Sequence, residues 1–318
     1  MPGLDLQDLV ERALGGQQVA VARLISIVEN AGPELREVSA ALTPHTGRAQ
    51  VVGLTGSPGV GKSTTTSALV SALRARGRTV GVLAVDPSSP FSGGALLGDR
   101  VRMGEHAGDD GVFIRSMATR GHLGGLSWAT PQALRVLDAA GCDVVLIETV
   151  GVGQSEVEIV GLADTTVVLL APGMGDGIQA AKAGILEIGD VFVVNKADRD
   201  GARRTVRELR TMLHLREAES GEPWEPPVLS TVAARSEGID ALADALDEHR
   251  VWSEKSGDRD RRRRERVRRE IEAIGMEQVR ARMERVRGGR ELPGLAGQVL
   301  AGELDPWAAA DRLLDDAG

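Results

Sequence analysis

Three glycines, a lysine and two serines stand close together between residues 56 and 63, where the chain reads Gly-Ser-Pro-Gly-Val-Gly-Lys-Ser. This spacing matches G-x-x-x-x-G-K-[ST], the loop that cradles nucleotide phosphates, and it stands between an apolar run and a helix-forming stretch as that loop requires. Glycine lets backbone N–H groups converge on a phosphate, Lys62 reaches the β- and γ-phosphates, and the Ser63 hydroxyl binds Mg²⁺. A plain turn between strand and helix is the alternative. The predicted phosphate-binding residues are Gly56, Ser57, Pro58, Gly59, Val60, Gly61, Lys62, Ser63 and Thr64.

The tetrapeptide Asn195-Lys196-Ala197-Asp198 follows a later apolar run and matches N-K-x-D, which selects guanine. We expect a buried Asp198 carboxylate to accept hydrogen bonds from guanine N1–H and the exocyclic amine. Adenine presents an acceptor there and would leave the carboxylate unpaired, so the predicted ligand is GTP or GDP. A weaker candidate for a base-contacting loop, which could equally be an ordinary strand end, consists of Ser230, Thr231 and Val232.

Glu148 ends another apolar run and opens the sequence Glu-Thr-Val-Gly, which has the spacing of D-x-x-G with glutamate in place of aspartate. A carboxylate at the end of such a strand binds the metal, directly or through water, in enzymes that transfer phosphoryl groups. The Gly151 backbone N–H would then contact the γ-phosphate, and residues 150–158, including Gln154, would sense the nucleotide. The alternative for Glu148 is a strand-end carboxylate paired with a nearby base.

Asp86 also ends an apolar run, so we expect it at the same ligand-binding edge unless it caps the following turn. Asp99 lies farther along in a glycine-rich loop beside Arg100 and Arg102. Either arginine could stabilise the transferred charge, although surface ion pairing is the simpler role. Phosphoryl transfer to water depends on positioning and charge stabilisation rather than on a nucleophilic side chain. The isolated His106 is therefore interpreted as structural or solvent-exposed rather than catalytic.

Seven short apolar runs rich in β-branched residues lie between residues 50 and 232 and alternate with helix-forming segments. Continuous runs of this kind, followed by glycine- or aspartate-rich turns, are typical of a parallel sheet buried on both faces. The predicted fold class is α/β: a P-loop NTPase with a doubly wound, mostly parallel sheet flanked by helices, and with helical N- and C-terminal extensions. Ligands bind outside the carboxyl ends of the strands in such sheets, which is where the motifs fall.

Helical periodicity marks both ends of the chain. Apolar residues recur every three or four positions from residue 4 to about 41, and again from Val267 to Val286 in a strongly charged segment. We expect an N-terminal helical extension at 1–47, a P-loop domain at 48–250 and a C-terminal helical arm, compatible with dimerisation, at 251–318. The arginine-rich run at 261–264 is interpreted as a solvated helical face, and a last helix is expected near Pro306.

Composition narrows the class of protein. The 46 acidic and 38 basic side chains give a net charge of −8, and 2% aromatic residues are too few for a base-stacking surface, so a nucleic-acid partner is not expected. The single Cys142 excludes an intramolecular disulfide and fits a reducing compartment. Acidic residues near the N-terminus and the lack of a membrane-length apolar stretch predict a cytoplasmic protein without a membrane partner.

Taken in order, the phosphate loop, VDPSSP, GALLGDRVRM, RSMATRGHLGGLS, ETVGVGQSE and NKAD resemble one family. The set is similar to the MeaB/ArgK family of methylmalonyl-CoA mutase-associated GTPases, of which VDPSS and ETVGVGQSE are the most specific pieces. The resemblance runs from about ARLISIVEN through NKAD and, less distinctly, into the C-terminal arm. It implies Mg²⁺-dependent GTP hydrolysis, with Lys62 and Gly151 at the phosphates and a metal and catalytic set of Ser63, Asp86, Asp99 and Glu148.

The resemblance also implies a client protein. A segment at 173–182 would relay nucleotide state to a mutase through Asp176, Gln179 and Lys182, although the family often has a second lysine where Ala183 stands. Members are homodimers that gate the delivery of adenosylcobalamin to an acyl-CoA mutase and expel damaged cofactor, using GTP hydrolysis that the partner accelerates. Methylmalonyl-CoA mutase or a relative is thus the expected partner.

Two other functions stay open at this point. The first is metal delivery to another metalloenzyme, although nickel-insertion relatives usually carry His- or Cys-rich tracts and this chain has five His and one Cys. The second is a small-molecule kinase linked to basic amino-acid transport, for which the sequence shows no evident acceptor pocket.

Overall fold

The computed structural model describes residues 5–30, 34–86, 104–106, 108–118, 129–149, 161–173, 185–214, 224–287 and 291–315. The chain forms two compact units, Met1–Arg263 and Arg264–Gly318. The first unit contains the sheet and both of the sequence motifs that are expected to bind the nucleotide.

Within the described residues, seven strands form one sheet in the order β3-β2-β4-β1-β5-β6-β7, and every neighbouring pair is parallel. All seven predicted runs are strands, which confirms the α/β class and the doubly wound topology. Their bounds are β1 Gln50–Thr55, β2 Val80–Asp86, β3 Val112–Ala118, β4 Val144–Thr149, β5 Thr165–Leu170, β6 Val191–Val194 and β7 Val228–Ser230.

The central strands are mostly apolar because both faces of the sheet are covered, and the polar residues at their ends, such as Gln50, Thr55 and Thr165, are buried as well. Successive residues of β1 show this directly, since Val51 packs into one buried cluster and Val52 into another. In β4, Val145 and Ile147 join the first cluster, whereas Val144 and Leu146 join the second. A strand with this burial has no polar face, which explains the uninterrupted Val, Leu and Ile runs.

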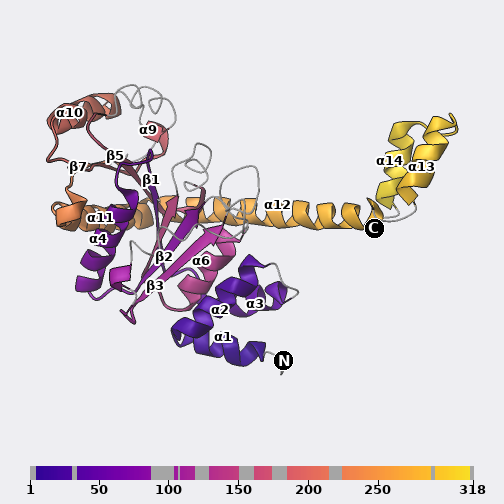
Figure 1. The fold of residues 1–318 in the computed structure, drawn as a ribbon, viewed down its shortest axis with the longest axis horizontal. Coiled ribbons are helices and arrows are strands. Elements are labelled where there is room, and N and C mark those ends of the chain that lie inside the picture. Colours follow the sequence, from indigo (N-terminus) through magenta and orange to yellow (C-terminus); the bar gives the residue numbers. More distant parts are fainter. Residues whose placement is uncertain are drawn as a thin grey trace. The chain divides into compact units, whose positions relative to one another are not determined.

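One face of the sheet is covered by α1 (Leu6–Leu14), α2 (Gln18–Glu29), α3 (Leu35–Leu42) and α6 (Thr130–Ala139), whose apolar residues share a core with β2 and β4. Figure 1 shows the three N-terminal helices, in indigo, gathered beside α6. The other face is covered by α4 (Lys62–Ala75) and α11 (Ile239–Ser256), and α10 (Ala202–Leu213) packs on β6 and β7. The described ranges also contain shorter helical segments: η1 Thr43–His45, η2 Gly104–His106, α9 Ile185–Ile188 and η3 Ala233–Arg235.

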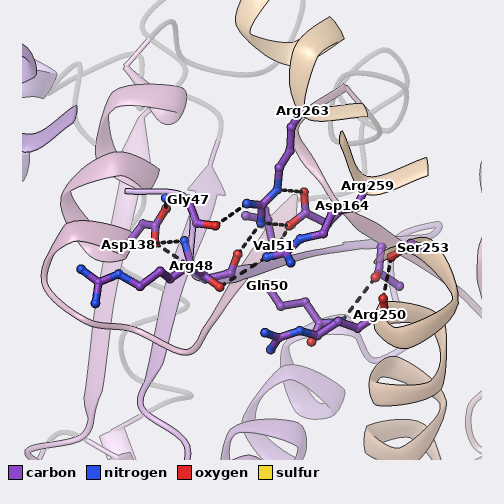
Figure 2. Close-up of polar contacts among 12 residues, drawn as sticks. Gly47, Arg48, Gln50, Val51, Asp138, Asp164, Arg250, Ser253, Arg259 and Arg263 are labelled. Atoms are coloured by element: carbon purple, nitrogen blue, oxygen red, sulfur yellow. Dashed lines mark hydrogen bonds and ion pairs between the residues drawn. The ribbon is translucent and has the colours of Figure 1, made fainter. Parts of the chain in front are cut away.

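Two aspartates at the amino ends of neighbouring strands hold the first turns of α12 (Asp258–Arg287). Arg263 donates to both oxygens of Asp164, which precedes β5, at 3.1 and 2.7 Å, and to the carbonyl of Ala49 at 2.8 Å. Arg262 donates to both oxygens of Asp190, which precedes β6, at 2.8 Å each. Figure 2 shows Arg263 reaching Asp164 from the helix above it.

These contacts correct the interpretation of the arginine-rich run as a solvated face for its two middle residues, whereas Arg261 and Arg264 are exposed as predicted. Only 21% of the Arg262 side chain and 18% of the Arg263 side chain are exposed, because each guanidinium binds an aspartate at the sheet edge. Burial raises the pKa of Asp190, but the interaction with the His249 ring nitrogen 3.5 Å away and the charge of Arg262 outweigh it and lower that pKa to about 2. Asp190 is therefore ionised, and both of its carboxylate oxygens accept hydrogen bonds from Arg262.

The second unit consists of the rest of α12 with α13 (Glu291–Leu300) and α14 (Pro306–Asp315). The last helix begins at Pro306, as predicted. The part of the predicted apolar stripe on α12 whose side chains the structure describes is exposed: Val267, Ile271, Ile274 and Val279. The side chains of Met283 and Val286 lie outside the described residues. None of the helices in the described ranges is long and apolar enough to cross a membrane.

Candidate nucleotide-binding site

The phosphate loop joins β1 to α4 at the carboxyl edge of the sheet, and two of its glycines are enforced by their surroundings. Gly56 has φ 144°, and a Cβ atom there would lie 2.2 Å from the carbonyl oxygen of Leu169 in β5. Gly61 has φ 98°, and its Cβ would lie 2.4 Å from the amide nitrogen of Asn195. The loop is thus packed directly against the next strand and against the N-K-x-D element.

Lys62 is the first residue of α4 and is buried. Its ammonium group donates to the carbonyl of Gly56 and, at 3.3 Å, to that of Ser57, so the charge lies across the mouth of its own loop. The residue before it, Gly61, is the N-cap of α4 and forms no side-chain cap, which leaves the positive end of the helix dipole facing the loop. A lysine charge and a helix N-terminus at one point favour an anion there.

Ser63 and Glu148 meet beside this loop. The Ser63 hydroxyl donates to Glu148 Oε1 at 2.6 Å, and both side chains are buried. Glu148 lies near the end of β4, opposite Leu54 of β1 and Ala84 of β2, so it occupies the middle of the sheet's carboxyl edge. A hydroxyl and a carboxylate oxygen in contact are the kind of ligands that Mg²⁺ prefers, and the residues present fit that ion.

The structure describes little of the remaining predicted metal and switch residues. Asp86 ends β2 in register with Ala118 of β3, which puts its backbone at the same edge as Glu148, although its side chain is outside what the structure describes. The others lie wholly outside the described residues: Asp99, Gly151, Gln154, Asp176, Gln179 and Lys182.

Asn195 connects three loops of the site. Its amide nitrogen donates to the carbonyl of Val60 in the phosphate loop at 2.9 Å, and its amide oxygen accepts from the Thr231 hydroxyl at 3.1 Å and from the Ala233 N–H at 3.0 Å. Lys196 adopts a left-handed φ of 57° and donates to the carbonyl of Gly59 at 2.6 Å. Asn195 therefore positions loops in this structure.

The structure gives the weakly predicted loop at 230–232 a clear position. Thr231 is buried against Asn195, and its carbonyl accepts from the Ala197 N–H at 3.0 Å. Val232 is also buried, whereas Ser230 ends β7 on the surface. The loop thus lies beside the N-K-x-D element.

Asp198 departs from the expectation of a buried carboxylate. In this structure 41% of its side chain is exposed, because it lies at the surface beyond the end of β6, where Arg235 approaches its Oδ2 atom to 3.6 Å. Arg235 was not among the predicted site residues. No motif marks it, since arginine is common in surface loops and its partner is distant in the sequence.

His106 lies apart from the phosphate loop. It is buried against α4, where its Nε2 atom is 3.1 Å from the Ser67 hydroxyl and 3.1 Å from the Ser67 carbonyl. This packing agrees with a structural role. Among the described residues there is no group of three or more His, Cys, Asp or Glu that could hold a metal ion.

Comparison with known proteins decides the family. Residues 21–287 match the family described as methylmalonyl-CoA mutase-associated GTPase MeaB. This chain belongs to the MeaB family. The match spans the phosphate loop, Glu148 and the N-K-x-D element, so it confirms the resemblance inferred from the motifs.

Individual relatives agree with the MeaB assignment. A Pyrococcus abyssi protein named as a GTPase is 48% identical over 98% of this chain and 96% of its own length. GTPase ArgK of Escherichia coli is 37% identical over 76% of this chain and 75% of its own, and the mouse protein named methylmalonic aciduria type A homolog, mitochondrial, is 37% identical over 94% and 76%. The chain is therefore a P-loop GTPase that binds guanine nucleotides.

A solved structure supports the fold of this MeaB-family chain. The crystal structure of LAO/AO transport system kinase aligns with a TM-score of 0.72 and 26% identity, over 99% of this chain and 98% of that one. The agreement covers the helical termini as well as the sheet.

Proposed function

We propose that this MeaB-family GTPase uses GTP hydrolysis to control the loading of adenosylcobalamin into an acyl-CoA mutase, methylmalonyl-CoA mutase or a relative, and to protect that mutase. The observation that carries the proposal is the family match over residues 21–287, together with relatives named for the GTPase activity and for methylmalonic aciduria. The proposal places the protein in the cytoplasm with its client and gives it no nucleic-acid or membrane partner.

The phosphate loop supplies the binding energy for the triphosphate. Backbone N–H groups of the loop and the N-terminus of α4 face the phosphates, and Lys62 would leave the Gly56 and Ser57 carbonyls to reach the β- and γ-phosphates. Ser63 and Glu148 would hold Mg²⁺, with Asp86 and Asp99 completing the carboxylate set. Bound magnesium would neutralise charge on the phosphate oxygens.

Residues of this chain would also place the attacking water and sense the nucleotide. In the proposal, Asp99, Glu148 and Gly151 act around the γ-phosphate, and Gln154 lies in the sensing stretch that follows the Glu-Thr-Val-Gly sequence. Asp176, Gln179 and Lys182 would pass the change to the mutase. The base is read by Asp198, while Asn195, Lys196 and the 230–232 loop hold the surrounding backbone.

The C-terminal arm is proposed as the dimer contact. Its exposed apolar side chains lie on a helix that otherwise carries dense charge, and burying them against a second copy would remove that surface from water. The same copies would then present two sites to the client mutase.

A second candidate function follows from one relative. The aligned crystal structure is titled LAO/AO transport system kinase, which favours phosphoryl transfer to an acceptor other than water. The two functions differ in where the γ-phosphate goes, so the same assay separates them.

The experiment is steady-state GTP hydrolysis by the purified protein, with and without the adenosylcobalamin-dependent acyl-CoA mutase of the same organism, and with ATP as control. Guanine-specific release of inorganic phosphate that the mutase accelerates supports the proposal. Hydrolysis that the mutase leaves unchanged removes the client from the proposal. In a parallel assay with a basic amino acid added as acceptor, loss of GTP without release of inorganic phosphate supports the kinase.

A further inference from the structure

Arg235 lies in a short closed loop between β7 and α11. The backbone N–H of Val232 donates to the carbonyl of Glu237 at 3.0 Å and the reverse hydrogen bond is 3.3 Å, so an antiparallel bridge closes the loop. At its far end Gly238 has φ 76°, and a Cβ there would lie 2.4 Å from the carbonyl oxygen of Ser230. The backbone of Arg235 is therefore held in place.

The loop is attached to the element that reads the base. The Ala233 N–H donates to the Asn195 amide oxygen at 3.0 Å, and the Ala197 N–H donates to the Thr231 carbonyl at 3.0 Å. Arg235 follows Ala233 by two residues and Asp198 follows Ala197 by one. The two side chains thus project from backbones that are hydrogen-bonded to each other.

Three charged side chains, Glu237, Arg235 and Asp198, lie in sequence from this loop to the N-K-x-D element. Glu237 Oε1 accepts a hydrogen bond from Arg235 Nε at 2.8 Å, and Arg235 Nη1 lies 3.6 Å from Asp198 Oδ2. A planar guanidinium presents two edges, so Glu237 occupies one and orients the other towards the aspartate. Arg235 and Asp198 are both partly exposed, which makes the pair weak but leaves it accessible to a ligand.

We infer that Arg235 is a positioning residue for guanine recognition, which holds the Asp198 carboxylate in the plane that presents both oxygens to the base. The inference rests on the proposal that Asp198 reads the base. Guanine offers two donors, N1–H and the exocyclic amine, and the terminal torsion of aspartate is otherwise broad. Hypoxanthine offers N1–H alone, which a carboxylate accepts over a wider range of orientations. Arg235 therefore contributes to the preference for guanine over hypoxanthine.

The test compares GDP with IDP, whose base is hypoxanthine, by calorimetric titration of the full chain with Mg²⁺ present. Arg235→Ala lowers the ratio of IDP to GDP dissociation constants by about two- to fivefold, the range for an exposed ion pair. Arg235→Lys recovers part of the ratio. The matched control is Arg204→Ala, which removes an exposed arginine that pairs with Glu208 at 2.8 Å on α10, and it leaves the ratio unchanged.

Asp198→Ala is measured in parallel, so that failure of the role of Arg235 can be distinguished from failure of the proposed base site. A large fall of the ratio in Asp198→Ala beside an unchanged ratio in Arg235→Ala overturns the role of Arg235 and leaves the proposed base site standing. Equal weakening of GDP and IDP by Arg235→Ala means that the residue only supports the loop, which also overturns the inference. An unchanged ratio in Asp198→Ala overturns the base-site assignment and the role of Arg235 with it.

Discussion

An aspartate that pairs with an arginine lies at each end of strand β6, but the two pairs differ in burial. At the amino end Asp190 is buried and receives two hydrogen bonds from Arg262 at 2.8 Å, whereas at the carboxyl end Asp198 is 41% exposed and lies 3.6 Å from Arg235. The first carboxylate is engaged on both oxygens, and the second keeps a surface that a base can reach. The amino edge of the sheet thus anchors α12, whereas the carboxyl edge leaves Asp198 accessible to solvent.

The largest expected effect is on the free energy of unfolding, and it tests the amino end of β6, where Asp190 binds Arg262. Asp190→Ala leaves the guanidinium of Arg262 partly buried beside Asp258 alone, and breaking a buried ion pair costs about 3–5 kcal/mol. We expect that loss in urea unfolding, with the turnover of the folded protein kept. Asp198→Ala is the control, because an exposed pair contributes at most about 1 kcal/mol. Equal destabilisation by the two variants would contradict the contrast.

Lys62→Ala tests the carboxyl edge of the sheet, where the nucleotide is proposed to bind. We expect GTP turnover to fall roughly 100- to 1,000-fold, the scale for loss of one group that stabilises transition-state charge, while the unfolding midpoint stays near that of the parent. Lys255→Ala, an exposed lysine on α11, is the matched control. Turnover at the parent rate in Lys62→Ala would rule out the phosphate-site assignment.

Asp198→Asn sharpens the comparison by changing the base that the carboxyl end of β6 is expected to select. An asparagine presents one acceptor and one donor, so guanine meets a mismatched donor, whereas the C2 carbonyl of xanthine accepts from it. GTP affinity should drop roughly 10- to 100-fold, the cost of leaving a polar group unpaired, and XTP affinity should rise. Competition titrations measure both, and an unchanged preference for GTP would remove Asp198 from base recognition.

The smallest expected effect is the loss of stability at acidic pH that comes from protonation of Asp190. Because the pKa of Asp190 is about 2 in the folded protein, below its ordinary value near 4, its contribution is present above pH 4 and is lost as the pH falls towards 2. We expect about 1 kcal/mol of that contribution to be gone by pH 3. Asp190→Asn, which does not titrate, should lose less stability between pH 5 and pH 3; an equal loss would place the titrating group elsewhere.

Sequence reasoning was strongest where one continuous segment holds all the necessary information. The phosphate loop and the seven strands could be predicted because glycine spacing and unbroken apolar runs report local backbone demands and burial on both faces. It was weaker for Asp198, which was expected to be buried and is exposed, since the accessibility of a strand-end carboxylate depends on loops that lie elsewhere in the chain.

The contacts that distinguish the two edges join residues far apart in the sequence. Arg262 was interpreted as solvated because its own helix is densely charged, and nothing local showed that Asp190, 72 residues earlier, lies beneath it. The sequence likewise did not show that Asn195 holds loops together, because its hydrogen-bond partners Val60 and Ala233 lie 135 residues before it and 38 residues after it.

The order of the residues alone was enough for the fold class, the family and the chemistry of the phosphate loop, because these depend on patterns within short segments. Which aspartates are buried and which stay accessible was decided by tertiary structure. Parallel strands bring all their starts to one edge and all their ends to the other, so a carboxylate's partners come from whatever helices and loops the topology places there.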